Sequence, residues 1–181
     1  MSRIATPAPE NAPVESRPIL DAVHKQLGVV PNLYRVIANS PAVLTGFAGL
    51  AGALAKTLDV RTRERIALAV AEVNGCGYCL SAHTYLATNL AKLSAEEVAL
   101  NRKGGSADAK AAVAVQFAAK VARERGHVSD ADVAAVLAAG YSEAQVVEIV
   151  AVVVENVFTN FLNNVVGTEI DFPVVTVSAA A

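Results

Sequence analysis

The sequence contains no tryptophan, a single methionine and few aromatic residues, which make up 5% of its 181 residues. Alanine and valine therefore supply most of the apolar side chains, and such small side chains let helices pack closely. Hydrophobic residues still account for 54% of the chain and charged residues for only 18%, so the chain can bury a sizeable core and is not disordered. This length suits a single domain. A chain this apolar often buries one of its faces against copies of itself, so we predict a homo-oligomer.

Basic blocks are absent too, and the net charge is -2, which argues against nucleic acid as a partner. The polar, proline-bearing residues 1–18 lack the apolar stretch of a secretory signal. Charges interrupt each apolar run before it could span a bilayer; Glu148 and Glu155, for example, bracket residues 149–154. We therefore expect a cytoplasmic protein with no membrane partner.

Helix start and stop signals recur along the chain, whereas β-hairpin signals and glycine-rich phosphate loops are absent. Asn32 is the expected N-cap of a short helix, and Ser94 with Glu97 and Ser142 with Gln145 are expected capping boxes. The main predicted helices cover residues 17–27, 33–38, 41–56, 60–73, 76–91, 107–125 and 143–165. Two further helices are expected to begin at Ser94 and Ser129.

These signals divide the chain into three parts. Residues 1–16, with three prolines, are predicted to form an extended arm. Residues 17–175 are predicted to form one helical domain, and residues 176–181 a tail.

The chain has two cysteines, Cys76 and Cys79, whereas a secreted disulfide scaffold would carry more. At this spacing on a helix the two thiols lie on adjacent turns and can form a disulfide with little movement. The break at Asn74-Gly75 places Cys76 at a helix N-terminus, where free N–H groups favour a thiolate. We expect Cys76 to be the more exposed thiol.

Two proton-transferring side chains accompany the thiols. His83 follows Cys79 by four residues, so its imidazole lies one turn along on the same helix face. Glu64 lies on the preceding apolar helix, and antiparallel packing of the two helices would bring one of that helix's carboxylates close to the sulfurs. Glu72 is interpreted as a solvent-facing group or salt-bridge partner at the helix end.

The spacing of Glu64, Cys76, Cys79 and His83 resembles the signature of the alkylhydroperoxidase D-like group within the carboxymuconolactone decarboxylase superfamily. Residues 27–33, LGVVPNL, and 169–173, EIDFP, resemble a peroxidase-related branch of that group. The resemblance extends from about Leu20 to Pro173.

The resemblance implies an all-α, AhpD-like bundle of packed helical hairpins, assembled as a trimer or hexamer. It also implies a thiol-dependent peroxidase without a cofactor, served by an external thiol or dithiol reductant. Cys79 would be the peroxidatic cysteine, Cys76 the resolving cysteine, and Glu64 and His83 a proton relay. Tyr78 stands where the best-studied type of the family has a histidine, and a phenol near its usual pKa cannot act as an imidazole at neutral pH.

Other interpretations of these residues stay open at the level of sequence. The cysteines could be two small buried apolar residues, or could bind a metal together with His83 and Glu64. The pair could also serve a redox sensor or thiol–disulfide exchange protein that turns over little peroxide. The four asparagines at 156, 160, 163 and 164 are interpreted as helix-end and subunit contacts.

Overall fold

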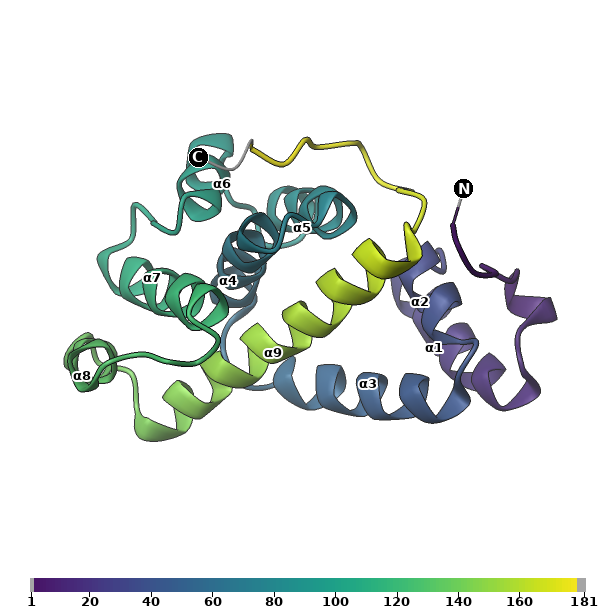
Figure 1. The fold of residues 1–181 in the computed structure, drawn as a ribbon, viewed down its shortest axis with the longest axis horizontal. Helices are drawn as coiled ribbons and strands as arrows, with labels where there is room; N and C mark the ends of the chain where they lie inside the picture. The colour runs from purple at the N-terminus through teal and green to yellow at the C-terminus, as the bar shows by residue number, and fades with distance from the viewer. Residues whose placement is uncertain (1, 179–181) are drawn as a thin grey trace.

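The computed structural model describes residues 2–178, which contain α-helices and two short 3-10 turns but no β-strand (Figure 1). The expected all-α fold is therefore confirmed. The turns are η1 (Pro9–Asn11) and η2 (Val14–Ser16), and the helices are α1 (Arg17–Leu27), α2 (Asn32–Ile37), α3 (Pro41–Leu54), α4 (Val60–Val73), α5 (Gly77–Asn89), α6 (Ala95–Arg102), α7 (Ala109–Arg123), α8 (Asp130–Ala138) and α9 (Glu143–Val166).

Helix α4 lies at the centre of the fold because most of its circumference is apolar. All residues from Ile66 to Ala71 are at most 2% exposed. A helix that is apolar all round has to be covered on every side, and α4 packs against α5, α6, α7 and α9. It begins where the Asp59 carboxylate accepts a hydrogen bond from the Thr62 main-chain N–H at 3.1 Å, as expected of an N-cap.

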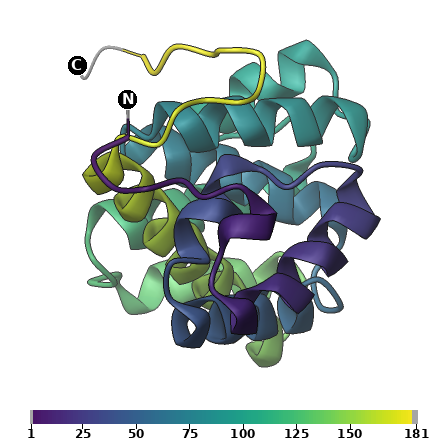
Figure 2. The same ribbon diagram turned by 90° about the vertical axis from the view of Figure 1, so that its right-hand side faces the viewer.

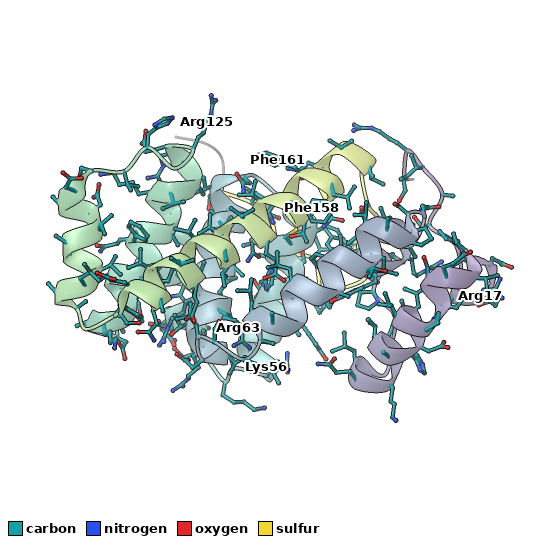
Figure 3. All side chains as sticks on the ribbon, turned by 90° about the horizontal axis from the view of Figure 1, so that it is seen from below. Arg17, Lys56, Arg63, Arg125, Phe158 and Phe161 are labelled. Atoms are coloured by element: carbon teal, nitrogen blue, oxygen red, sulfur yellow. The ribbon has the colours of Figure 1, made fainter. Side chains whose placement is uncertain are left out.

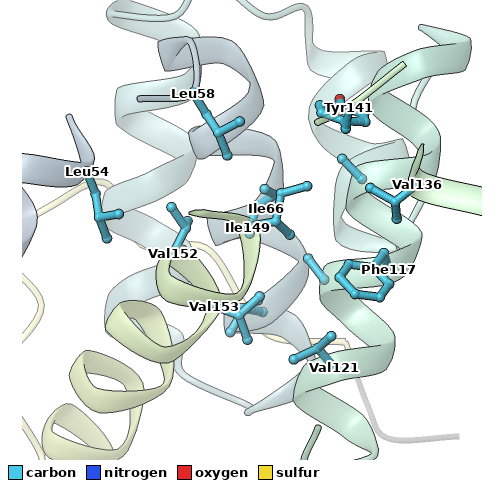
Figure 4. Packing of buried hydrophobic residues seen from close by; sticks show 13 residues of the cluster. Leu54, Leu58, Ile66, Phe117, Val121, Val136, Tyr141, Ile149, Val152 and Val153 are labelled. Carbon is cyan, nitrogen blue, oxygen red and sulfur yellow. The ribbon is translucent and has the colours of Figure 1, made fainter. Parts of the chain in front are cut away.

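Figure 4 shows the main core cluster, in which α4 and α9 meet α7 and α8. Ile66 and Ile149 are fully buried where α4 meets α9, and Phe117 and Val136 close the cluster from α7 and α8. Most of the remaining space is filled by valine, leucine and alanine. The scarcity of aromatic residues is thus met by close helix packing rather than by a loose core.

Helices α1 to α3 form a second cluster against the far end of α9. Leu20, Ile37 and Leu44 are buried there, with Leu162 of α9 packed against them. Helix α1 ends at Gly28, whose φ of 77° is the left-handed conformation that glycine adopts without strain. Figure 2 looks onto this side, where the N-terminal residues cross in front of these helices.

The residues after α9 form a strap over α5, which we call the C-terminal segment (residues 168–178). It runs from the end of α9 back toward α6 (Figure 1). The Val175 N–H donates to the Ser81 hydroxyl at 2.9 Å, and the Ser178 N–H donates to the Glu72 carboxylate at 2.6 Å. The predicted tail thus begins within an attached segment, and residues 179–181 lie outside the described part of the chain.

The N-terminal arm is not extended throughout, contrary to the prediction from its prolines. It contains both 3-10 turns and buries Ala12 and Ser16. The Ser16 hydroxyl donates to the Ala38 carbonyl at 2.8 Å, and the Arg35 guanidinium donates to the Pro7 carbonyl at 2.8 Å. These long-range bonds fold the arm onto α1 and α2. Met1 lies outside the described residues.

Two of the expected caps differ from the sequence interpretation. The N-cap of α2 is Pro31, and Asn32 is the first helical residue. The Asn32 N–H instead donates to the Asp171 carboxylate at 2.7 Å, so this residue anchors the C-terminal segment. Ser94 accepts from the Glu97 N–H at 3.2 Å, but the Glu97 carboxylate is used elsewhere, so only half of that capping box forms.

Helix α9 is, by length and composition alone, apolar enough to cross a membrane, and it is the one such helix within residues 2–178. Glu148 and Glu155 are therefore too few to exclude a span, contrary to the argument from sequence. In this fold α9 packs against α3, α4, α5 and α7. A long helix in a protein core can have the same length and apolar composition.

A buried carboxylate ties α4 and α6 to the loop before α7. Glu97 is 8% exposed and accepts hydrogen bonds from the Arg65 guanidinium at 2.8 Å, the Asn101 amide at 3.0 Å and the Ala107 N–H at 2.9 Å. Burial raises the pKa of Glu97, but the hydrogen bonds, with that from Ser106 first, lower it overall to about 2.

We predict that Glu97→Gln lowers the free energy of unfolding by about 1–3 kcal/mol, because buried donors lose their acceptor. Since the folded pKa lies below the unfolded value of about 4.3, this stabilisation is present at neutral pH and is lost as the pH falls toward the folded pKa. Urea unfolding at neutral and acidic pH measures it. Glu96→Gln, on the exposed neighbour, is the control, and equal effects of the two substitutions would contradict the prediction.

Candidate active site

A sharp turn between α4 and α5 places the cysteine pair. Gly75 has a φ of 63°, which reverses the chain after Asn74. Cys76 is then the N-cap of α5, and its sulfur accepts a hydrogen bond from the Cys79 N–H at 3.3 Å. The two sulfurs lie 2.8 Å apart as free thiols, with the Cys76 thiol donating to the Cys79 sulfur. The pair is therefore close enough to form a disulfide.

Both thiols are buried, so the expectation that Cys76 is the more exposed is wrong. Cys76 is 0% exposed and Cys79 is 2% exposed. The C-terminal segment explains this, because it lies across the start of α5, with Ile170 beside Gly77 and Phe172 packed edge-on against Tyr78. Local helix geometry could not reveal a cover supplied by the far end of the chain.

Cys79, but not Cys76, lines a cavity of about 390 Å³. The cavity lies between α5, α3 and the α1–α2 region, and most of its lining is apolar. Its aromatic lining residues are Tyr34, Phe47, Tyr78, Tyr85 and Phe172. Glu64 and His83 open onto the same space. A molecule in this cavity would therefore meet the Cys79 sulfur and the proton-transferring pair together.

Glu64 and His83 form an ion pair between α4 and α5. The His83 Nδ1 lies 2.9 Å from the Glu64 carboxylate, and Glu64 is 8% exposed. Burial alone would lower the pKa of His83, but the charge and hydrogen bond of Glu64, followed by the charge of Cys79, raise it overall. The imidazole is thereby favoured in its protonated form beside the thiols.

The two thiols differ in acidity. The hydrogen bond from Cys76 has the largest effect on Cys79 and, with the positive charge of His83, lowers the pKa of Cys79 to about 6 despite burial. The same hydrogen bond, together with burial, raises the pKa of Cys76. The helix N-terminus alone would favour Cys76 as the thiolate, but the contacts at Cys79 outweigh it. The structure thus brings all four expected site residues together, with Cys79 as the acidic thiol.

Comparison with known proteins shows which family this site resembles. Residues 41–124, which include all four site residues, match the model of the carboxymuconolactone decarboxylase family. The chain is also similar to the crystal structure of an alkylhydroperoxidase AhpD core, an uncharacterized peroxidase-related protein from Ralstonia eutropha JMP134. That chain is 26% identical, with a TM-score of 0.83 and coverage of 94% of this chain and 92% of the other.

Residues 41–124 are thus similar to the carboxymuconolactone decarboxylase family, and the whole chain has the fold of the AhpD core. A second structure with this fold, an uncharacterized peroxidase-related protein from Silicibacter sp. TM1040, has 24% identity, a TM-score of 0.79 and coverage of 92% of this chain and 89% of the other. The debrominase Bmp8, in complex with 2,3,4-tribromopyrrole, shares the fold with 21% identity, a TM-score of 0.74 and coverage of 87% and 86%. No curated protein sequence matches the chain significantly.

At Tyr78 the chain departs from the best-studied pattern of the family that it resembles, and the structure gives that residue a packing role. The ring is 5% exposed, and the hydroxyl accepts a hydrogen bond from the Leu33 N–H at 3.1 Å. Burial, the largest effect, raises the pKa of the phenol. Tyr78 therefore closes the wall of the cavity and stays neutral at physiological pH.

The structure also bears on two further interpretations of the sequence, the role of Glu72 and a metal site. The interpretation of Glu72 as a salt-bridge partner is confirmed, since it pairs with Arg102 at 2.8 Å. Within residues 2–178, no three His, Cys, Asp or Glu side chains are arranged to hold a metal ion.

The sequence interpretation missed functional neighbours on α9. The Asn163 amide donates to the Cys79 sulfur at 3.2 Å, so this asparagine does not make the helix-end or subunit contact that the sequence suggests. Glu155 lines the cavity, and burial, its largest effect, raises the pKa of that carboxyl. The spacing of 156, 160 and 163 along one helix face was a usable signal.

We predict that thiol titration of the reduced protein gives one group with a pKa of about 6 and a second that stays protonated at neutral pH. His83→Gln and Glu64→Gln should each raise the lower pKa, the first by about one unit or more, because the cationic neighbour is lost or discharged. The double variant should shift it much less than the sum. Ultraviolet thiolate absorbance measures these values.

His24→Gln is the matched control for this titration, because His24 is exposed on α1 and lies away from the thiols. Unchanged titration in His83→Gln would show that the imidazole does not act on Cys79.

Proposed function

We propose that the protein is a thiol-dependent peroxidase that reduces hydrogen peroxide or organic hydroperoxides through Cys79 and Cys76. One observation carries the proposal: an acidic thiol lines a cavity while its partner thiol lies 2.8 Å behind it. Peroxides are attacked by thiolates, and the intermediate needs a second thiol close by. The likeness of residues 41–124 to the carboxymuconolactone decarboxylase family, and of the fold to the AhpD core, supports the same chemistry.

The proposed reaction has two steps at the sulfurs. The Cys79 thiolate attacks one peroxide oxygen, the O–O bond breaks, and sulfenic acid forms while the other oxygen leaves as an alcohol or water after taking up a proton. The Cys76 thiol then attacks the Cys79 sulfur, which forms the disulfide and releases water. An external thiol or dithiol returns two electrons and two protons, becomes a disulfide itself, and restores both thiols.

Glu64 and His83 are the proposed proton relay. The protonated imidazole stabilises the Cys79 thiolate and can donate its proton to the leaving oxygen. Glu64 supports this by holding the charged imidazole 2.9 Å away. When Cys76 loses its proton in the second step, the same imidazole is available to accept it.

The cavity supports organic hydroperoxides as the better substrates. Hydrogen peroxide is far smaller than a cavity of about 390 Å³ and gains nothing from apolar walls. An alkyl or aryl hydroperoxide would bury its organic part against the aromatic side chains.

We predict that one equivalent of peroxide converts the two free thiols to none within one chain. Steady-state peroxide consumption should require a thiol or dithiol reductant and should disappear in Cys79→Ser. Cys76→Ser should react once and accumulate sulfenic acid, because the resolving thiol is missing. Thiol counting, intact mass and coupled turnover with cumene hydroperoxide measure these outcomes.

The outcomes separate this function from its alternatives. Rapid disulfide formation without turnover, whatever dithiol is supplied, would favour the redox sensor. Because a structural neighbour is a debrominase, 2,3,4-tribromopyrrole belongs in the same assay; bromide release without peroxide consumption would replace the peroxidase with a reductive dehalogenase.

We also propose that the protein works as a cytoplasmic homo-oligomer, a trimer or hexamer. An apolar stripe lies on the outer side of α9 beside α3, and Figure 3 shows Phe158 and Phe161 there. Its exposed members are Val43, Leu50, Val147, Val154, Phe158, Phe161 and Val165. The exposed fractions of Phe161, 55%, and Val165, 67%, are high for apolar side chains next to one another on a helix.

We predict that Phe161→Glu with Val165→Glu converts an oligomer to monomers at micromolar concentration, because charges cannot be buried in that contact. Sedimentation velocity measures the state. Val174→Glu is the control, since Val174 is 73% exposed and lies outside the stripe. A wild-type protein that sediments as a monomer would contradict the proposal.

A further inference from the structure

Three asparagines form a buried polar row on helix α9. Asn156, Asn160 and Asn163 are 6%, 0% and 3% exposed, and their spacing of four and three residues places them on one helix face. Burying an amide is costly unless it makes hydrogen bonds. Asn156 donates to the Val152 carbonyl at 2.8 Å, so its cost is met within α9. The other two amides need another explanation.

The side chain of Asn163 is oriented so that its NH2 group faces the reactive sulfur and its side-chain oxygen is left without a hydrogen-bond partner. Its amide nitrogen donates to the Cys79 sulfur at 3.2 Å, while its side-chain oxygen is buried without a hydrogen-bond partner. A neutral thiol is a weak acceptor, whereas a thiolate accepts a charge-assisted hydrogen bond. The contact therefore stabilises the ionised form of Cys79 more than the protonated form.

Asn160 is held in an orientation that leaves its side-chain NH2 group without an acceptor. Its side-chain oxygen accepts a hydrogen bond from the Asn74 amide at 2.9 Å, which fixes the orientation of the group. Its nitrogen is then buried with no hydrogen-bond partner. The amide of Asn160 also lowers the pKa of Cys79, after the larger effects of Cys76, His83 and Asn163. An amide N–H without a partner can donate a hydrogen bond to the nearby sulfur once that sulfur is a thiolate.

These amides differ from the other groups that stabilise the thiolate, because they do not change during the reaction. Cys76 donates its thiol hydrogen to Cys79 in the reduced state, but it must give up that hydrogen to form the disulfide. His83 gains and loses a proton. Water has little access to the sulfur, since Cys79 is only 2% exposed and meets solvent only through the cavity. Fixed amide donors would supply solvation that is present at each step.

We propose that Asn163 is a further catalytic residue of this site, and that Asn160 is a second donor beside it, so that the two amides take the place of water around the Cys79 thiolate. The inference rests on the proposed peroxidase function for its role in turnover. Its effect on the thiol can be measured without any peroxide.

The test is a thiolate titration in the full-length Cys76→Ala protein, in which Cys79 is the single thiol. Asn163→Ala should raise the pKa of Cys79 by about one unit or more, as expected for the loss of a hydrogen bond to a charged acceptor. Asn163→Leu, which keeps the branched shape of the side chain without its polar atoms, should do the same and serves if the alanine variant fails to fold. Asn160→Ala should shift the pKa in the same direction by a smaller amount.

Asn164→Ala is the matched control on the same helix. Its side chain is exposed and donates to the Asn74 carbonyl at 3.1 Å rather than to the sulfur. It should leave the titration within experimental error of the parent protein. An equal shift in this control would mean that any disturbance of α9 changes the thiol, which overturns the inference.

Peroxide kinetics then connect the titration to turnover. With Cys76 restored, Asn163→Ala should react with cumene hydroperoxide about tenfold more slowly for each unit of raised pKa when the pH lies below the pKa values of both proteins, and the difference should shrink as the pH rises. A residue with a merely structural role would lower the rate equally at each pH.

The two proposals fail separately. A folded Asn163→Ala or Asn163→Leu protein with unchanged thiol titration overturns the amide pair, even if the wild type consumes peroxide. A shifted titration in a protein that consumes no peroxide supports the amide pair and overturns the peroxidase.

Discussion

The close packing of α4 against α5 is the constraint on which the site depends. Small side chains such as Ala67 and Ala71 line α4, and they are at most 2% exposed. Because these helices approach closely, a carboxylate on one and an imidazole on the other meet at 2.9 Å in a largely buried place at the edge of the cavity. An ion pair in such a place is stronger than one in water. The apolar composition of the chain and the polarity of its site are therefore two results of the same packing.

Within that site, contacts rather than helix position decide which sulfur is ionised. Cys76 has the helix N-terminus, but it donates its hydrogen to Cys79, which also has His83 and Asn163 as neighbours. The effect of the helix N-terminus falls off within one turn and is modest beside several direct hydrogen bonds. Two cysteines that look equivalent in sequence thereby acquire different acidities, as a peroxidatic and a resolving thiol would need.

Much of this could be predicted from the sequence where the controlling interactions are local. The bounds of α1 and α4 follow from Gly28 and Asp59, which end and begin helices by local geometry. The spacing of the four site residues was also informative. By contrast, Asn163 contacts Cys79 across 84 residues, and the cover over Cys76 comes from the far end of the chain. Such contacts depend on how helices pack, which no local pattern specifies.

The C-terminal segment makes the two cysteines differ in accessibility. It covers the side on which Cys76 lies, and Cys79 alone of the two faces the cavity. A disulfide in this position offers an incoming thiol a single sulfur to attack, so Cys79 would be captured first and Cys76 would always be the leaving group. Access would then be decided by the width of the attacking molecule: a slender thiol can follow the cavity, whereas a folded protein surface would first have to displace the hydrogen bonds of Val175 and Ser178.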